Sequence, residues 1–387
     1  MPRRIAVVTV ARSDYGHLLP LLKAIDAAPE LTLSLFVAGG HLAARFGATA
    51  DFVAADGWTI AERVDCTAES DAPDAIARSI GAAVSGFAGA LTRTRPDVLV
   101  VLGDRFEMLG AGLAALPLGV PVAHLHGGEV TEGVIDEQVR HALTKLSHLH
   151  FAATPDYARR ILQMGEEPWR VHCSGAPGLD RFAAIPPLPR AELARRLGLS
   201  LRRPTLLVTF HPVTLDLEAT DHHLDELLAA LESVDGDVVL TYPGADPDSQ
   251  RVIDRLTRFV EGRERARLVP ALGDDVYVSL LRESDAMVGN SSSGIIEAAS
   301  FALPVVNIGE RQRGRVRAAN VIDVGYGRGE IVAGIRRARD PAFRRSLDGL
   351  RNPYGDGRAT PRIVKTLSEV ELGRRLITKR FVDLPPR

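Results

Sequence analysis

Cysteines, aromatic side chains and an excess of either charge are all scarce in this 387-residue sequence. Its two cysteines, Cys66 and Cys173, stand far apart and form no C-x-x-C pair, which argues against a disulfide scaffold or a structural zinc site. The 47 basic and 49 acidic residues nearly cancel, so nothing points to nucleic acid or to an anionic membrane surface. No stretch approaches the roughly 20 apolar residues of a membrane helix, and the N-terminus lacks a secretory apolar region. We therefore expect a cytoplasmic protein without a nucleic-acid or membrane partner.

What the sequence does contain is a regular alternation of apolar, strand-like runs with helix-like segments. IAVVTV, LTLSLFVA and DVLVVL are continuous and rich in β-branched residues, as in strands buried on both faces of a parallel sheet. Alternation of this kind predicts an α/β, doubly wound fold, in which binding sites lie at the carboxyl ends of the strands.

The length suggests two or three domains at roughly 150 residues each. Three prolines occur within four residues in the stretch FAAIPPLPRAEL, at 182–193, where they make a stiff, extended linker. Beyond this linker the α/β pattern restarts. We predict an N-terminal domain at 1–183, a C-terminal domain at 184–360, a cleft between them, and a C-terminal helix at 361–387 that crosses back to the first domain.

Two motifs of the first half follow strands directly. In VARSDYG, Arg12 emerges at the end of the first strand and before a helix, where a guanidinium can clamp a phosphate. The alternative is a solvated arginine in a surface turn. In GDRFEML, Asp104 and Arg105 occupy the same kind of position, although an Asp–Arg pair can also be purely structural.

The stretch GNSSSGIIEAAS in the second half is more specific. A strand ends at Gly289, the hydroxyl residues 291–293 follow, and a helix is predicted from Gly294. Unpaired backbone N–H groups at a helix start and nearby hydroxyls can bind a phosphate, and no Walker-A lysine is present. The carboxylate of Glu297 is suited to accept a hydrogen bond from a ribose hydroxyl. A simple serine N-cap is the alternative, and we favour a nucleotide diphosphate site.

Histidines and carboxylates gather in HLHGGEVTEGVIDEQVRH, at 124–141. We predict that His124 and His126 lie on one face of a strand. H-x-H beside a glutamate occurs in metal sites of all-β barrels, but this chain is α/β and has no third histidine at a fitting distance, so we predict no metal. Carboxylates here, with His211 of TFHPVT after a strand of the second half, are the groups that proton transfer at carbon requires.

Together these stretches resemble the UDP-N-acetylglucosamine 2-epimerase family, and its hydrolysing branch in particular. The resemblance covers nearly the whole chain. It is carried, in order, by RSDYG, GDRFEML, HLHGGEVTEGVIDEQVRHALTKLSHLHF, TFHPVT and GNSSSGIIEAASFALPVVNIGERQRGR. It implies a GT-B-like fold of two Rossmann-type domains with UDP bound between them. It also implies a role in sialic-acid or legionaminic-acid pathways, a homodimer or homotetramer, and no redox cofactor.

The resemblance assigns roles position by position. Positions that match the family's UDP-binding residues are Arg12, Arg105, Ser291, Ser292, Glu297 and Arg311. Catalytic positions fall on Asp104, Asp136 and His211, and the neighbouring Glu137 is the alternative to Asp136. Some relatives have glutamate where this chain has His126, so the acid/base role at that point falls either to His126 or to Glu129.

The activity implied is conversion of UDP-GlcNAc, or of UDP-2,4-diacetamido-2,4,6-trideoxy-glucose, to the free 2-epimeric manno sugar and UDP. Anti elimination would give a glucal, and hydration of the glucal would follow, with charge on the leaving diphosphate stabilised by arginines and the helix start. Three alternatives use similar residues: a non-hydrolysing 2-epimerase, a GT-B glycosyltransferase that needs an acceptor, and a non-catalytic nucleotide-sugar sensor.

Overall fold

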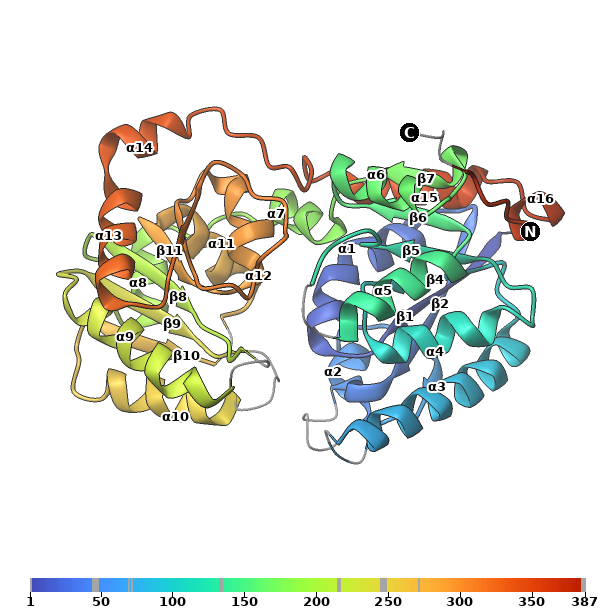
Figure 1. Cartoon of the computed structure of the whole chain (residues 1–387), viewed down its shortest axis with the longest axis horizontal. Coiled ribbons are helices and arrows are strands. Elements are labelled where there is room, and N and C mark those ends of the chain that lie inside the picture. The colour runs from blue at the N-terminus through green and yellow to red at the C-terminus, as the bar shows by residue number, and fades with distance from the viewer. Residues whose placement is uncertain are drawn as a thin grey trace. The chain divides into compact units, whose positions relative to one another are not determined.

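Two parallel β-sheets organise the chain. The computed structural model describes residues 2–43, 49–68, 70, 72–131, 135–213, 217–243, 249–270 and 272–383. The chain divides into unit 1, made of Met1–Arg181 and Tyr354–Arg387, and unit 2, made of Phe182–Pro353 (Figure 1). Unit 1 thus contains both ends of the chain, and unit 2 is one continuous segment.

Unit 1 holds a seven-stranded sheet in the order β3-β2-β1-β4-β5-β6-β7, with every strand parallel to its neighbours. Its strands are β1 (Arg3–Thr9), β2 (Leu31–Ala38), β3 (Ile60–Val64), β4 (Val98–Leu102), β5 (Val122–Leu125), β6 (Leu149–Ala152) and β7 (Val171–Cys173). Its helices are α1 (Arg12–Ala27), α2 (Ala50–Ala55), α3 (Pro73–Thr94), α4 (Phe106–Ala115), α5 (Ile135–Leu146), α6 (Pro155–Gln163), α15 (Ala359–Glu369) and α16 (Arg374–Ile377).

Unit 2 holds a six-stranded parallel sheet in the order β10-β9-β8-β11-β12-β13. Its strands are β8 (Thr205–Thr209), β9 (Asp237–Thr241), β10 (Ala266–Val269), β11 (Ala286–Gly289), β12 (Val305–Ile308) and β13 (Val321–Val324). The helices are α7 (Arg181–Ala184), which bridges the boundary, α8 (Arg190–Leu197), α9 (Thr220–Glu232), α10 (Ser249–Val260), α11 (Asp274–Glu283), α12 (Ser292–Ile296), α13 (Arg328–Arg339) and α14 (Pro341–Ser346).

Alternating residues of the strands fill two separate cores in unit 1. Ile5 and Val7 face α1 and α15 in one core, whereas Ala6 and Val8 face α3, α4 and α5 in the other. Figure 1 shows α3, α4 and α5 lying together over one face of the sheet. Because both faces are covered, the strands are apolar at successive positions, as the sequence indicated.

Helix α3 corrects one sequence-based prediction. It has 22 residues and is long and apolar enough to cross a membrane by length and composition alone. The prediction from the sequence that no stretch approaches the roughly 20 apolar residues of a membrane helix is therefore wrong. Small residues account for this composition, since α3 packs closely on α4: a Cβ added at Gly110 would collide with Ala83. Phe87 of the same helix is fully buried in the core of unit 1.

In each sheet the strand order reverses direction at one point, between β1 and β4 in unit 1 and between β8 and β11 in unit 2. Helices leave neighbouring strands toward opposite faces there, so the loops at the carboxyl ends diverge and leave room for a ligand. Arg12 and Asp104 follow β1 and β4, and His211 and Ser291 follow β8 and β11. The fold thus positions these four sequence-predicted residues at the two reversal points.

Candidate functional site

Arg12 is the first residue of α1 and is exposed. Its guanidinium carbon lies 5.3 Å from the ring centre of Phe52 on α2, a cation–π distance. The ring restrains the side chain at the carboxyl edge of the first sheet. An exposed, restrained guanidinium is suited to bind a phosphate group.

Arg105 caps the start of α4 and sits among carboxylates. Its Nε donates to Oε2 of Glu107 at 3.3 Å, and Glu107 is almost completely buried. Burial lowers the pKa of Arg105, but the carboxylates of Glu107, Asp14 and Asp136 outweigh that effect and raise it. Asp136, at the start of α5, therefore acts electrostatically on Arg105.

Asp14 was not singled out from the sequence, and the structure makes it part of this edge. Oδ2 of Asp14 accepts from the backbone N–H of Val10 at 2.7 Å and from the hydroxyl of Thr9 at 3.3 Å. Its other oxygen, Oδ1, is buried and has no hydrogen-bond partner within the described residues. Burial raises the pKa of Asp14 to about 6. The only sequence signal was an acidic residue two positions after Arg12.

His41 extends this buried network and was also missed. Nε2 of His41 lies 2.9 Å from the Thr9 hydroxyl, and Nδ1 lies 2.7 Å from the hydroxyl of Thr49. Since Thr9 donates its hydroxyl proton to Asp14, His41 must donate from Nε2 and accept at Nδ1. Burial lowers the pKa of His41 to about 4, so its ring is neutral at pH 7.

Arg140 joins the two carboxylate motifs of unit 1. Its side chain, 2% exposed, donates to the carboxylate of Asp104, to Oε2 of Glu137 at 3.1 Å and to the hydroxyl of Thr131 at 2.5 Å. The second oxygen of Glu137 lies 3.1 Å from Nε2 of His141. Both oxygens of Glu137 are thus engaged within α5 and its preceding loop.

His126 and Glu129 form a single hydrogen-bonded pair. Nδ1 of His126 lies 2.6 Å from Oε1 of Glu129, and both side chains are largely buried. The two alternatives that the sequence left open for one acid/base role are therefore in direct contact.

The prediction that His124 and His126 share one face of a strand is wrong. β5 ends at Leu125, and His126 follows it with φ 62°, a left-handed conformation that ends the strand. Nε2 of His124 instead lies 2.7 Å from the carbonyl of Gly103, and burial lowers the pKa of this ring to about 3. Across the described residues, no three His, Cys, Asp or Glu side chains are grouped to hold a metal ion.

In unit 2, Asn290 connects the loops that carry His211 and the serines. Its side chain accepts from the backbone N–H of His211 at 2.7 Å and donates to the carbonyl of His211 at 2.8 Å. Its own carbonyl accepts from Gln312 Nε2 at 2.9 Å and from Arg311 Nη1 at 3.3 Å. Asn290 is fully buried, and it thereby positions His211 and Arg311 at the carboxyl edge of the second sheet. It was not singled out from the sequence.

The serine stretch starts a shorter helix than expected. α12 begins at Ser292 rather than near Gly294, Ser291 is its N-cap, and the α-helix ends after Ile296. The Ser291 hydroxyl lies 3.0 Å from the Ser293 hydroxyl and 3.4 Å from the Ser293 backbone nitrogen. The serines therefore present hydroxyls and helix-start N–H groups at the carboxyl edge, where an anion is stabilised.

Glu297 ends α12 rather than lying one turn inside a longer helix. It is 4% exposed, and its Oε2 accepts from the hydroxyl of Tyr277 on α11 at 2.7 Å. A carboxylate held in this way presents its remaining acceptor capacity in a fixed direction.

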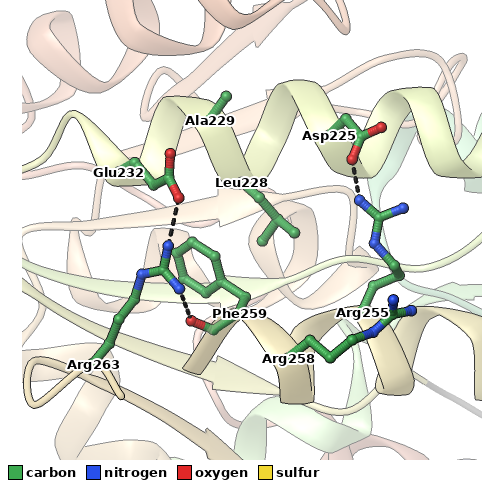
Figure 2. Close-up of a pocket in the computed structure, with 8 residues that line it drawn as sticks. All are labelled: Asp225, Leu228, Ala229, Glu232, Arg255, Arg258, Phe259 and Arg263. Carbon is green, nitrogen blue, oxygen red and sulfur yellow. Dashed lines mark hydrogen bonds and ion pairs between the residues drawn. The ribbon is translucent and has the colours of Figure 1, made fainter. Parts of the chain in front are cut away.

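A recess on the helical surface of unit 2 contains none of the predicted residues. Figure 2 shows it between α9 and α10, with a floor of Leu228 and Phe259. Ion pairs close both sides: Arg255 contacts Asp225, and Arg263 contacts Glu232. The candidate functional residues therefore lie at the strand edges and not in this recess.

The chain is similar to known proteins over nearly its whole length. Residues 23–368 match the family model described as UDP-N-acetylglucosamine 2-epimerase. The chain is 35% identical to UDP-N,N′-diacetylbacillosamine 2-epimerase (hydrolyzing) of Legionella pneumophila, over 98% of this chain and 99% of the relative. It is 32% identical to GDP/UDP-N,N′-diacetylbacillosamine 2-epimerase (hydrolyzing) of Campylobacter jejuni, over 99% of both chains.

Solved structures show the same fold. UDP-GlcNAc 2-epimerase of Neisseria meningitidis, bound to UDP-GlcNAc, superposes with a TM-score of 0.78 at 18% identity, over 94% of this chain and 99% of that one. The enzyme of Methanocaldococcus jannaschii in complex with UDP-GlcNAc and UDP superposes with a TM-score of 0.74 at 16% identity, over the same shares. The predicted fold class, GT-B-like with two doubly wound domains, is confirmed.

Proposed function

The chain belongs to the UDP-N-acetylglucosamine 2-epimerase family, and we propose that it is a hydrolysing member, which releases a free 2-epimeric manno sugar and UDP. Two relatives that match almost end to end are named as hydrolysing 2-epimerases. The observation that carries the proposal is the set of acid/base groups at the carboxyl edge of the unit 1 sheet. Asp104, the His126–Glu129 pair and Asp136 all lie on that edge.

The reaction proposed has two steps that balance without a redox change. A base removes the C2 proton while the C1–oxygen bond to UDP breaks, which leaves a 2-acetamidoglucal and UDP. Water then adds its oxygen to C1, and a proton returns to C2 from the other face. The groups that remove and return protons must start in opposite protonation states.

The residues divide between these tasks. Asp104 and Asp136 are the proposed carboxylates for proton transfer at C2, and the His126–Glu129 pair is proposed to activate water. Glu137 remains the alternative to Asp136, and its two oxygens contact Arg140, Thr131 and His141. His211, held by Asn290 through its backbone, is the proposed proton donor to the leaving group.

UDP is proposed to bind through positive charge and hydrogen-bond donors. Negative charge grows on the diphosphate as the C1–oxygen bond breaks, so groups placed there stabilise the transition state more than the substrate. The proposed residues are Arg12 and Arg105 in unit 1 and Ser291, Ser292, Glu297 and Arg311 in unit 2. In this scheme Glu297 accepts from a ribose hydroxyl, and the others hold the phosphates.

Among the two candidate substrates, we favour the 2,4-diacetamido-2,4,6-trideoxy sugar. The relatives named for diacetylbacillosamine are 35% and 32% identical to this chain, against 29% for the Neisseria meningitidis protein named UDP-N-acetylglucosamine 2-epimerase. With this substrate we propose a place in legionaminic-acid synthesis, whereas UDP-GlcNAc as substrate would place the chain in a sialic-acid pathway.

Proton NMR in D₂O tests the reaction. Purified protein is incubated with UDP-GlcNAc and, separately, with the UDP-diacetamido sugar, with EDTA present in both. The expected result is UDP together with a free manno sugar deuterated at C2, formed faster from the diacetamido substrate. A UDP-linked manno sugar would identify a non-hydrolysing epimerase, and no turnover of either substrate would overturn the proposal in favour of a transferase or a sensor.

We further propose a homodimer or homotetramer in the cytoplasm. Leu113, Leu116 and Leu118, at and after the end of α4, are between 36% and 46% exposed, and the adjacent outer face of α3 exposes small residues such as Ala82. Exposed apolar area of this kind is typical of subunit contacts. Light scattering after size-exclusion chromatography measures the mass, and a monomer at micromolar concentration would contradict the assembly.

A further inference from the structure

The amino edge of the second sheet carries a recess rich in arginine. It encloses about 350 Å³ and is lined by Arg203, Pro204, Asp285, Arg339 and Arg344. Pro204 and Asp285 directly precede β8 and β11. The recess therefore lies at the opposite end of these two strands from His211 and Ser291, and the proposed reaction does not use it.

A nearly buried carboxylate organises the recess. Asp285, 8% exposed, accepts from the backbone N–H of Thr205 at 2.9 Å, from Arg203 Nη1 at 2.6 Å and from Arg344 Nη1 at 3.3 Å. Arg344 also donates to the carbonyl of Asp285 at 3.0 Å. Two guanidinium groups are thus held in fixed orientations by one anchored residue, which lowers the entropy that a ligand must remove on binding.

The arginines outnumber the acidic groups that they face. Glu283 lies 4.0 Å from Arg203 but is also paired with Arg190. Arg339, exposed at the end of α13, has no hydrogen-bond or ion-pair partner among the residues that the structure describes. Positive charge beyond what Asp285 balances is therefore concentrated in a concave site, although the chain as a whole carries a formal charge of −2.

We propose that this recess binds a compact phosphate-type oxyanion, either inorganic or the phosphate group of a small metabolite. Guanidinium groups match the oxygens of phosphate with paired N–H donors. Arg203 and Arg344 supply oriented donors, and Arg339 supplies the charge that the fold leaves unbalanced. The site is open to solvent, so the affinity expected is modest, with a Kd of about 0.1–10 mM.

The recess of Figure 2, between α9 and α10, does not have the same excess of positive charge, although it is also lined by three arginines. Two of them are paired with carboxylates across α9 and α10. The third, Arg258, donates to the carbonyl of Asp254 at 3.2 Å within its own helix. Arg258 therefore serves as a matched control: an arginine of the same unit that lines a recess without the Asp285 anchor.

Calorimetric titration of the full-length protein with inorganic pyrophosphate tests the proposal. Saturating UDP is present to occupy the nucleotide site, and ionic strength is held constant. The wild type and Arg258→Gln should show the same saturable binding, and Arg339→Gln should weaken it about tenfold. Arg339 makes no contact that folding requires, so this variant should keep the wild-type circular dichroism spectrum.

Two outcomes would overturn the site: equal affinity in Arg339→Gln and wild type, or no saturable binding below about 10 mM. Orthophosphate and glycerol 3-phosphate, titrated in the same way, distinguish an inorganic ligand from a phosphate ester by which anion binds more tightly. A separate titration with UDP alone reports on the nucleotide site, so that failure there is not confused with failure here.

Discussion

Arg140 shows how a single buried side chain determines what its neighbours can do. A guanidinium that is 2% exposed needs acceptors in place of water, and it takes them from Asp104, Glu137 and Thr131. Asp104 therefore has a structural partner as well as a proposed catalytic role. The two roles separate experimentally, because an amide keeps an oxygen for Arg140 but cannot act as a base.

Asp104→Asn should lower turnover by about 10²- to 10⁴-fold, the usual contribution of an acid/base group. UDP affinity should stay within about twofold, because Asp104 is not among the proposed UDP contacts. Steady-state kinetics and UDP titration measure the two quantities. A variant that remains fully active would leave Asp104 with its structural role alone.

Arg12→Ala should weaken UDP binding by about 1.5–3 kcal/mol, the range of a charge-assisted hydrogen bond. Arg12 is exposed, and its guanidinium packs over the ring of Phe52, so stability should change little. The control is Arg78→Ala, which removes an exposed arginine from α3. Calorimetry with UDP compares the two, and equal affinities would remove Arg12 from the site.

Asp14→Asn tests the buried carboxyl through pH. Burial raises the pKa of Asp14 from 3.8 to about 6, so its contribution to stability is fully present below pH 3.8 and is lost as the pH rises through about 6. Asparagine does not ionise, and its oxygen can still accept from Val10. The free energy of unfolding of the variant minus that of the wild type should therefore increase by up to about 3 kcal/mol as the pH rises from 4 to 7. Urea unfolding at both values measures this, and a pH-independent difference would mean that Asp14 is already ionised well below pH 6.

At the scale of elements, sequence patterns predicted the strands well because burial on both faces requires continuous apolar runs. β2 begins and ends where the run LTLSLFVA does. Local patterns failed where tertiary contacts decide the backbone. His126 leaves β5 in a left-handed turn, and α12 ends after five residues. Asp14, His41 and Arg140 were missed for the same reason: their partners are distant in the sequence, or their burial is evident only in the fold.

Gly289 ends β11 in a conformation that the following loop depends on. Its φ is 134°, and a Cβ at this position would collide with the carbonyl of Thr209 on β8. Gly289→Ala should therefore lower the free energy of unfolding of unit 2 by about 1–3 kcal/mol and weaken UDP binding through Asn290 and the serines. Gly262→Ala is the matched control, since Gly262 also has a positive φ but no atom within 4 Å of an added Cβ. Equal effects of the two changes would mean that the Thr209 contact is unimportant.

At the scale of the whole molecule, the chain leaves unit 1 after Arg181 and returns at Tyr354. Several residues fasten the returning segment. Arg170, fully buried, donates to the carbonyls of Arg375, Leu376 and Thr378 at 2.7–3.0 Å. Helical periodicity in the sequence predicted that the chain crosses back to the first domain in a helix that begins at residue 361. It did not reveal the break between α15 and α16, because the carbonyls of Leu367 and Val370 at that break accept from Arg3, near the other end of the chain.

Lys379 is the last charged anchor of this segment. Its Nζ lies 2.8 Å from Oε2 of Glu166 and donates to the carbonyls of Lys145 and Ser147 at 2.8 and 2.6 Å. The Glu166 side chain is completely buried, and Lys145 and His150 are its remaining partners. Removal of one cation leaves part of a buried carboxylate uncompensated.

Lys379→Met should therefore lower the free energy of unfolding of unit 1 by about 1–3 kcal/mol while UDP affinity stays unchanged, because the anchor lies outside the proposed site. Lys365→Met, at an exposed position of α15 in the same returning segment, should leave stability within about 0.5 kcal/mol of wild type. Calorimetric scans of both variants, with and without UDP, measure the effect. If Lys379→Met unfolds like wild type, the apolar contacts of α15 and the hydrogen bonds of Arg170 are enough to hold the returning segment, and the contact of Lys379 with Glu166 adds nothing to its attachment.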